Sequence, residues 1–161
     1  MTYAPFAPPI SPETLKAYLE TDYCVAVAPE TPGFTLRVGE VSEALARLSM
    51  PGQSMQAVFI TACNPLGVDT AEADNQTAQA RLASLLSGVA SLVLSGEGRG
   101  RIGVWPPEPS WLALGLDFDT ACRLGREFHQ NAIIWAGADF TPALVVLRGG
   151  GLLTLRPQVG Q

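Results

Sequence analysis

Residues 105–135, WPPEPSWLALGLDFDTACRLGREFHQNAIIW, contain the alternation of strand and helix that decides the fold. The apolar runs Trp111–Leu114 and Ala132–Trp135 have the length of short buried strands. Between them, Asp117–Phe128 has apolar residues at helical spacing and charged residues on its other side. This stretch therefore predicts a strand, an amphipathic helix and a second strand.

The same alternation extends in both directions along the chain. Further helices are predicted from Ser11, Ser42 and Thr70, because these residue types cap helix N-termini and apolar residues follow at helical spacing. Further strands are predicted at 23–28, 34–38, 56–62, 91–94, 143–147 and 152–155. The glycine-rich segment 96–103 is predicted to be a connector.

This order of elements predicts a single α+β domain in which one mixed β-sheet packs with about four helices. A layered α/β arrangement is the alternative. No repeat or linker divides the chain, and 161 residues are a usual length for one domain. We expect residues 1–10 to form a proline-rich arm and residues 11–161 to form the globular domain. The strand order does not follow from the sequence.

The composition limits the classes of partner. Hydrophobic residues make up 47% of the chain, which is enough for a core without disulfides, and charged residues only 16%. A surface with so few charges is compatible with an apolar patch that binds a protein partner or a second copy. The net charge of −5 and the single lysine, Lys16, argue against nucleic acid as a partner.

The cysteines and the apolar runs bear on metals and membranes. Cys24, Cys63 and Cys122 lie far apart, and His129 is the only histidine. We therefore expect no disulfide framework, no metal site and no cofactor. No stretch reaches the ~18 apolar residues of a membrane span, and the N-terminus lacks the pattern of a secretory signal. The expectation is a cytoplasmic protein that does not enter the membrane.

Several polar residues lie where the predicted strands meet loops and helices, which is where ligand sites are often built. Asn64 follows the strand at 56–62. Asn75 lies on the buried face of the next helix, where its amide must form hydrogen bonds, either with the 63–70 loop or with a ligand. The expected ligand-binding residues are Arg37, Asn64, Asn75, Glu108, Ser110, Gln130 and Asn131.

The letters GRGRIG at 98–103 match the dinucleotide pattern G-x-G-x-x-G. Two prolines follow shortly afterwards, so no helix begins there to hold a pyrophosphate. Arg99 and Arg101 leave a second hypothesis, an anion held by the loop amides, beside the simpler interpretation as a connector with solvated arginines.

Two residues invite a catalytic interpretation that the sequence does not favour. His129 lies near a helix C-terminus, a position typical of a partner for the helix dipole. Cys63 has no basic neighbour in the sequence and is typical of a small core residue.

Together, these segments resemble a bacterial family known as a domain of unknown function, number 3293. The resemblance covers residues 13–147. It is carried by Tyr18-Leu19, Tyr23, Leu36–Gly39, Phe59–Ala62, Asn64-Pro65, Asn75, Trp105–Ser110 and Gly125–Ala132.

The resemblance implies no activity, so three functions stay open. The first is a non-catalytic interaction or regulatory domain. The second is a domain that binds a polar small molecule resembling a nucleotide or a sugar. The third is a small enzyme using Glu108 as acid or base, for which the polar set is a poor match because it includes no poised base or metal site.

Overall fold

The computed structural model describes residues 10–49, 56–101, 106–148 and 153–155. The helices are α1 (Pro12–Leu19), α2 (Glu43–Leu48), α3 (Glu72–Val89) and α4 (Phe118–Glu127), with a short 3-10 turn, η1 (Pro65–Gly67). The strands are β1 (Thr21–Val25), β2 (Phe34–Leu36), β3 (Ala57–Ile60), β4 (Leu92–Gly100), β5 (Glu108–Leu114), β6 (Ala132–Ala136), β7 (Pro142–Val146) and β8 (Leu153–Leu155).

The strands form one eight-stranded sheet in the order β2-β1-β4-β5-β3-β6-β7-β8. The predicted α+β fold with one sheet and four helices is therefore confirmed for the described residues. The expectation of a mixed sheet is wrong, because every pairing between these strands is antiparallel. The strands predicted at 23–28 and 34–38 pair with each other as β1 and β2, and those predicted at 143–147 and 152–155 pair as β7 and β8.

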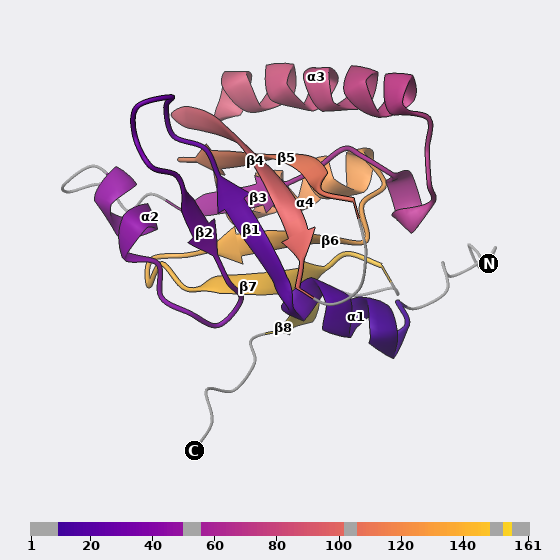
Figure 1. Ribbon diagram of the computed structural model, residues 1–161, viewed down its shortest axis with the longest axis horizontal. Coiled ribbons are helices and arrows are strands. Elements are labelled where there is room, and N and C mark those ends of the chain that lie inside the picture. The colour runs from indigo at the N-terminus through magenta and orange to yellow at the C-terminus, as the bar shows by residue number, and fades with distance from the viewer. Residues whose placement is uncertain (1–9, 50–55, 102–105, 149–152, 156–161) are drawn as a thin grey trace.

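The antiparallel order results from two interleaved crossovers. Helix α3 connects β3 to β4 and leaves a space that β5 fills, while α4 connects β5 to β6 and leaves a space that β3 fills. Each pair joined by a helix is parallel, but the strand between them runs the other way. The order β3-α3-β4-β5-α4-β6 is the split βαβ arrangement of ferredoxin-like folds. The strands β1 and β2 extend this core on one side, and β7 and β8 on the other (Figure 1).

Three of the helices begin at side-chain caps, and two of these caps, Ser11 and Ser42, were expected from the sequence. Ser11 Oγ accepts a hydrogen bond from the Thr14 amide, and Ser42 Oγ accepts one from the Leu45 amide. Asp117 caps α4 in the same way. Helix α3 differs, because it begins at Glu72 without a side-chain cap and continues past Gly88 to Val89.

The sheet has a hydrophobic core on each face. Val58 and Ile60 of β3 face α3 and α4, whereas the alternate residues Ala57 and Phe59 face the other side, toward α1 and α2. The sheet curls around this second core. The curl brings the chain just after β2 close to β7, where the Gly39 amide donates a hydrogen bond to the carbonyl oxygen of Pro142 (2.9 Å). Figure 1 shows α3 lying along one face and α1 beside one end of the strands.

The segment 96–100 is part of β4 and not of a connector, which corrects the prediction. Its residues pair with β1 on one side and with β5 on the other. A Cβ at Gly96 would lie 2.9 Å from the Phe59 ring and 2.4 Å from the Cys24 carbonyl oxygen. The glycine is therefore needed for close packing inside the sheet and not for a turn.

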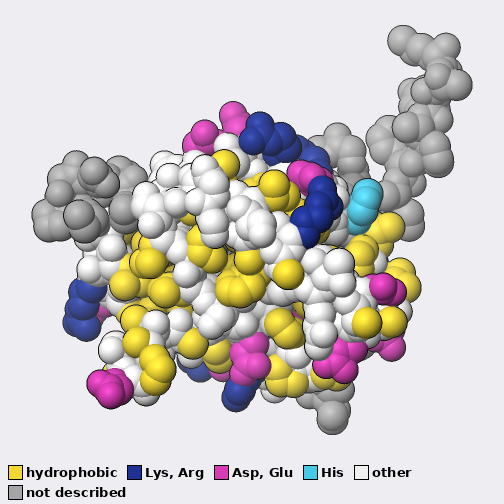
Figure 2. All heavy atoms as spheres, turned by 90° about the horizontal axis from the view of Figure 1, so that it is seen from above, with side chains coloured by type: hydrophobic (Ala, Val, Ile, Leu, Met, Phe, Trp, Pro, Cys, Tyr) yellow, Lys and Arg dark blue, Asp and Glu magenta, His cyan; other side chains and the backbone are white. Residues whose placement is uncertain are grey.

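The face covered by α3 is poor in charge at its centre, and hydrophobic side chains lie among uncharged ones there (Figure 2). Leu85 and Val89 of α3 are 37% and 45% exposed. Within the described ranges, no helix has the length and apolar character needed to cross a membrane.

Candidate functional site

One end of the sheet collects most of the polar residues singled out in the sequence. The strands β3, β4 and β7 end there, and β1, β5 and β6 begin there, because neighbouring strands are antiparallel. Helix α1 lies beside this end, where Arg101, just after β4, donates its amide to the Glu20 carbonyl oxygen. Residues far apart in the sequence therefore become neighbours.

Asn64, Asn75 and Glu108 form one hydrogen-bonded network. The Asn64 amide N–H donates to Asn75 Oδ1 (2.9 Å), and Asn75 Nδ2 donates in return to Asn64 Oδ1 (2.9 Å). Asn64 Nδ2 donates to Glu108 Oε2 (3.1 Å). Asn75 also donates to the Thr70 carbonyl oxygen (3.3 Å), so this amide supports the loop, the first of the two roles considered for it.

Helix α3 holds the chain that follows β3 through two amides one turn apart. Gln79 Oε1 accepts a hydrogen bond from the Ala62 amide (3.0 Å), just as Asn75 accepts one from the amide of Asn64. On the other side, Gln130 Nε2 donates to the Cys63 carbonyl oxygen (3.1 Å). The residues between β3 and η1 are thus fixed on both sides by amide side chains, of which Gln79 was not among the residues expected from the sequence.

The loop that carries Asn64 has an unusual backbone. Asn64, Leu66 and Gly67 have positive φ values of 48°, 59° and 74°, and Leu66 is 43% exposed. The Leu66 amide donates to the carbonyl oxygen of His129, which itself has a φ of 54°. A left-handed leucine is strained, and such residues often cluster at functional sites.

A second group of polar side chains surrounds Asn131 at the start of β6. Asn131 Nδ2 donates to the Tyr18 hydroxyl (3.2 Å), and Arg148 Nη1 donates to Asn131 Oδ1 (2.8 Å). The Tyr23 hydroxyl donates to the Tyr18 carbonyl oxygen (2.6 Å), which ties α1 to β1. A Cβ at Gly67 would lie 3.2 Å from Asn131 Nδ2, so the strained loop adjoins this group.

The electrostatics show that the two groups are close. Burial raises the pKa of Glu108, and the hydrogen bond from Asn64 partly opposes this rise. Burial also raises the pKa of Tyr18; the Asn131 hydrogen bond and the Arg148 charge lower it, and the Glu108 charge raises it further. The Tyr18 hydroxyl is therefore within the electrostatic reach of both a carboxyl group and a guanidinium group.

These two charges do not neutralise each other. The ion pairs formed among residues 10–49, 56–101, 106–148 and 153–155 include neither Glu108 nor Arg148. The buried Nε of Arg148 has no hydrogen-bond partner in that part of the chain. Buried polar groups are normally paired, so this donor needs an explanation.

Two other expected ligand-binding residues, Ser110 and Arg37, make contacts of a different kind. Ser110 is buried and donates to the Glu108 carbonyl oxygen (3.1 Å), so it supports the backbone of the site. Arg37 is half exposed and pairs with Asp22 (2.9 Å) on the surface, and among the described residues no hydrogen bond or ion pair joins it to Asn64, Asn75 or Glu108. Its role in ligand binding stays a prediction.

The arginines of the expected anion loop both have acidic partners. Arg99 Nε donates to Glu97 (2.6 Å), and Arg101 lies 3.2 Å from Asp22. The backbone of 98–100 belongs to β4, and residues 102–105 lie outside the described part of the chain. The structure therefore offers little support for the anion hypothesis.

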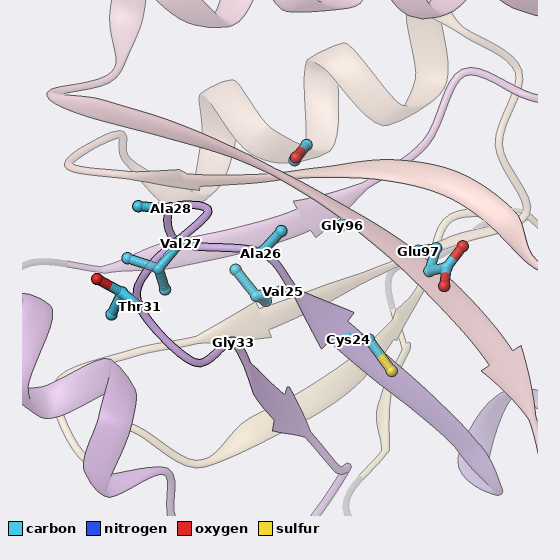
Figure 3. A pocket seen from close by; sticks show the side chains of 10 residues that line it. Cys24, Val25, Ala26, Val27, Ala28, Thr31, Gly33, Gly96 and Glu97 are labelled. Carbon is cyan, nitrogen blue, oxygen red and sulfur yellow. The ribbon is translucent and has the colours of Figure 1, made fainter.

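A shallow hollow of about 420 Å³ lies elsewhere, against β1, β4 and the turn after β1 (Figure 3). Backbone and small side chains such as Ala26, Ala28 and Thr31 form most of its wall. Its one charged side chain, Glu97, is paired with Arg99. None of the expected ligand-binding residues lines this hollow.

The side chains of this network are poorly suited to catalysis. Burial and, to a smaller extent, the Glu108 charge raise the pKa of the Cys63 thiol, which disfavours the reactive thiolate. The described residues contain no group of three or more His, Cys, Asp or Glu side chains that could hold a metal ion. The arrangement is suited to hydrogen bonding and ion pairing with a polar molecule.

Sequence reasoning missed Tyr18, Gln79 and Arg148. Tyr18 belongs to the motifs that carry the family resemblance, which was a usable signal. Gln79 lies one helical turn after Asn75, so it could have been read as a second inward amide. Arg148 follows an apolar strand without a motif of its own, and the sequence contains no signal for its role.

Comparisons with known proteins bear on the same region. Comparison with curated proteins and with solved structures gave no match. A family model described as "Protein of unknown function (DUF3293)" matches residues 60–133, which run from the end of β3 to the start of β6. This is shorter than the expected 13–147, and it includes Asn64, Asn75, Glu108 and Gln130. The resemblance inferred from the sequence is thus confirmed over residues 60–133, where the chain matches the model of this family of unknown function.

Proposed function

We propose that this protein is a non-catalytic domain that binds a polar small molecule at the end of the sheet that holds Glu108. The observation that carries the proposal is the convergence of polar side chains from α1, the β3–α3 loop, β5, β6 and the end of β7. Within this convergence, a carboxyl and a guanidinium group are partly buried without charged partners among the described residues.

A purely structural role explains only part of this set. Asn75, Gln79 and Gln130 hold backbone and need no ligand. Glu108 and Arg148 are different, because a charged group costs free energy when it is buried without a partner of opposite charge. A ligand that pairs with them would offset this cost.

Thermal unfolding with a panel of nucleotides, sugars, amino acids and organic acids tests the proposal. A ligand at ~100 times its Kd adds ~2.7 kcal/mol, which corresponds to about 5–10 °C for a domain of this size. The shift should be lost or strongly reduced in Glu108→Gln and retained in Arg47→Gln, which changes an exposed arginine of α2. No shift with any compound, or an equal shift in Glu108→Gln, would contradict the proposal.

A second candidate function, interaction with a protein partner or a second copy, is favoured by the partly exposed Leu85 and Val89 of α3, the helix on the face of low charge. Light scattering during size-exclusion chromatography tests self-association. A dimer that dissociates in Leu85→Ser but not in Glu108→Gln would support it, and a monomer at high concentration would contradict it.

We further infer a bacterial, cytoplasmic protein. The three free thiols, Cys24, Cys63 and Cys122, support this inference, because reducing compartments keep cysteines unpaired. Fractionation of the native host with an antibody against the chain tests it. Recovery outside the cytoplasm would contradict the inference.

A further inference from the structure

We propose that the ligand is a zwitterion of the amino-acid type, whose carboxylate pairs with Arg148 and whose ammonium group pairs with Glu108. This inference rests on the proposed function and assigns the chemical class of its ligand. It follows from the arrangement of the two charges and of the hydrogen bonds that hold them.

Arg148 is oriented for an anion. Its Nη1 donates to Asn131 Oδ1, which fixes one side of the guanidinium group. Its buried Nε has no acceptor among the described residues, so the donor edge of the guanidinium is incompletely used. A planar guanidinium group binds a carboxylate through two parallel hydrogen bonds, and this geometry suits a ligand that supplies two oxygens in one plane.

Glu108 is oriented for a hydrogen-bond donor that carries positive charge. One carboxyl oxygen accepts from Asn64 Nδ2, and none of the ion pairs among the described residues involves this acid. Asn64 is itself held by Asn75, so the carboxyl group has a fixed support. An ammonium group beside Glu108 would supply a positive charge and hydrogen-bond donors, and the described residues provide no such positive charge there.

Tyr18 connects the two charges. Its hydroxyl accepts from Asn131, which also holds Arg148, and it lies within electrostatic reach of Glu108. The loop from Asn64, which holds Glu108, to Gly67, which adjoins Asn131, brings the two charged groups to the same end of the sheet, and among the described residues they form no ion pair with each other. A ligand with two opposite charges satisfies both groups. A phosphate ester would satisfy Arg148 but would bring negative charge toward Glu108.

The test uses calorimetric titration of the purified full-length chain, first with the common amino acids. For the tightest one, three further probes are measured: the amine without its carboxylate, the acid without its amino group, and inorganic phosphate. Loss of a charge-assisted contact should weaken binding about tenfold to a hundredfold for either truncated analogue. Phosphate should not compete with the amino acid.

Variants of Arg148 and Glu108 test which residue binds the carboxylate and which binds the ammonium group of the ligand. In Arg148→Gln the amino acid and the amine should bind equally weakly, because the carboxylate has lost its partner. In Glu108→Gln the amino acid and the acid should bind equally weakly. Arg47→Gln, which changes a surface arginine of α2 paired with Glu43, is the matched control and should bind the amino acid as the unchanged protein does. If Arg148→Gln does not fold, Arg148→Lys, which keeps the charge but not the planar fork, replaces it.

The outcomes separate the inference from the proposed function. Binding of nucleotides or sugars, lost in Glu108→Gln, with no response to amino acids would overturn the zwitterion and leave the proposed function standing. Equal binding of the amino acid and its deaminated acid would also overturn it, because Glu108 would then have no role. No binding of any compound would overturn both.

Discussion

Replacement of Asn75 by alanine is expected to destabilise the protein through the loop between β3 and α3. The side chain accepts from the Asn64 amide at 2.9 Å and donates to Asn64 Oδ1 at 2.9 Å and to the Thr70 carbonyl oxygen at 3.3 Å. Alanine removes all three hydrogen bonds. The partly buried Asn64 N–H then has no partner in a loop that already contains left-handed residues.

The magnitude follows from these contacts. A buried donor left without an acceptor costs ~1–3 kcal/mol. Alanine recovers up to ~0.7 kcal/mol because it favours a helix more than asparagine does. The free energy of unfolding should therefore fall by ~1–2 kcal/mol, and Tm by ~2–8 °C.

Equilibrium urea unfolding measures this difference, with Gln76→Ala as the matched control on the same helix. Gln76 is exposed, and within the described part of the chain its side chain donates a hydrogen bond to Glu72, one turn earlier. The control should change the free energy of unfolding by less than ~0.5 kcal/mol. If Asn75→Ala were as stable as Gln76→Ala, the amide would not support the loop, and the reasoning would be refuted.

Three further changes test the site and the sheet. Burial raises the pKa of Glu108, so ionisation of this carboxyl group disfavours the folded state. The free energy of unfolding of the unchanged protein should therefore fall relative to that of Glu108→Gln as the pH rises through the pKa that Glu108 has in the folded protein. Parallel plots of the two free energies against pH from 4 to 8 would contradict this. The facing Tyr18 and Cys63 have raised pKa values and stay neutral over that range. Gly96→Ala should lower the free energy of unfolding by ~1–3 kcal/mol because its Cβ would meet backbone and a ring, and an unchanged urea midpoint would exclude that clash. Gly88→Ala, in an exposed turn of α3 with no atom within 4 Å of the added Cβ, should instead raise it by ~0.5–1 kcal/mol, and a loss of stability would contradict the open space there.

Local chemistry made most of the elements predictable. Ser11, Ser42 and Asp117 cap helices because their side chains accept amide hydrogens of the first turn, and this depends only on nearby residues. The extension of β4 to Gly100 was not predictable, because two neighbouring strands impose it against the low strand preference of glycine.

The candidate site was predictable where one short segment carries it. Asn64 and Asn75 are linked by a single loop, and their pairing follows from the inward position of Asn75 on its helix. The approach of Tyr18 and Arg148 depends on the position of α1 beside the curled sheet, which arises from contacts between distant segments. Hydrophobic periodicity contains no information on such contacts.

The interleaved crossovers also affect how the chain folds while it is being made. Strand β3 pairs only with β5 and β6, so it has no hydrogen-bonded neighbour until the ribosome has released Leu114. At ~5–20 residues per second, this fully apolar strand waits ~3–10 s after its own synthesis. During that interval it is an unpaired edge that a chaperone or another nascent chain can bind. Slow translation between β3 and β5 should therefore increase aggregation more than slow translation after β6.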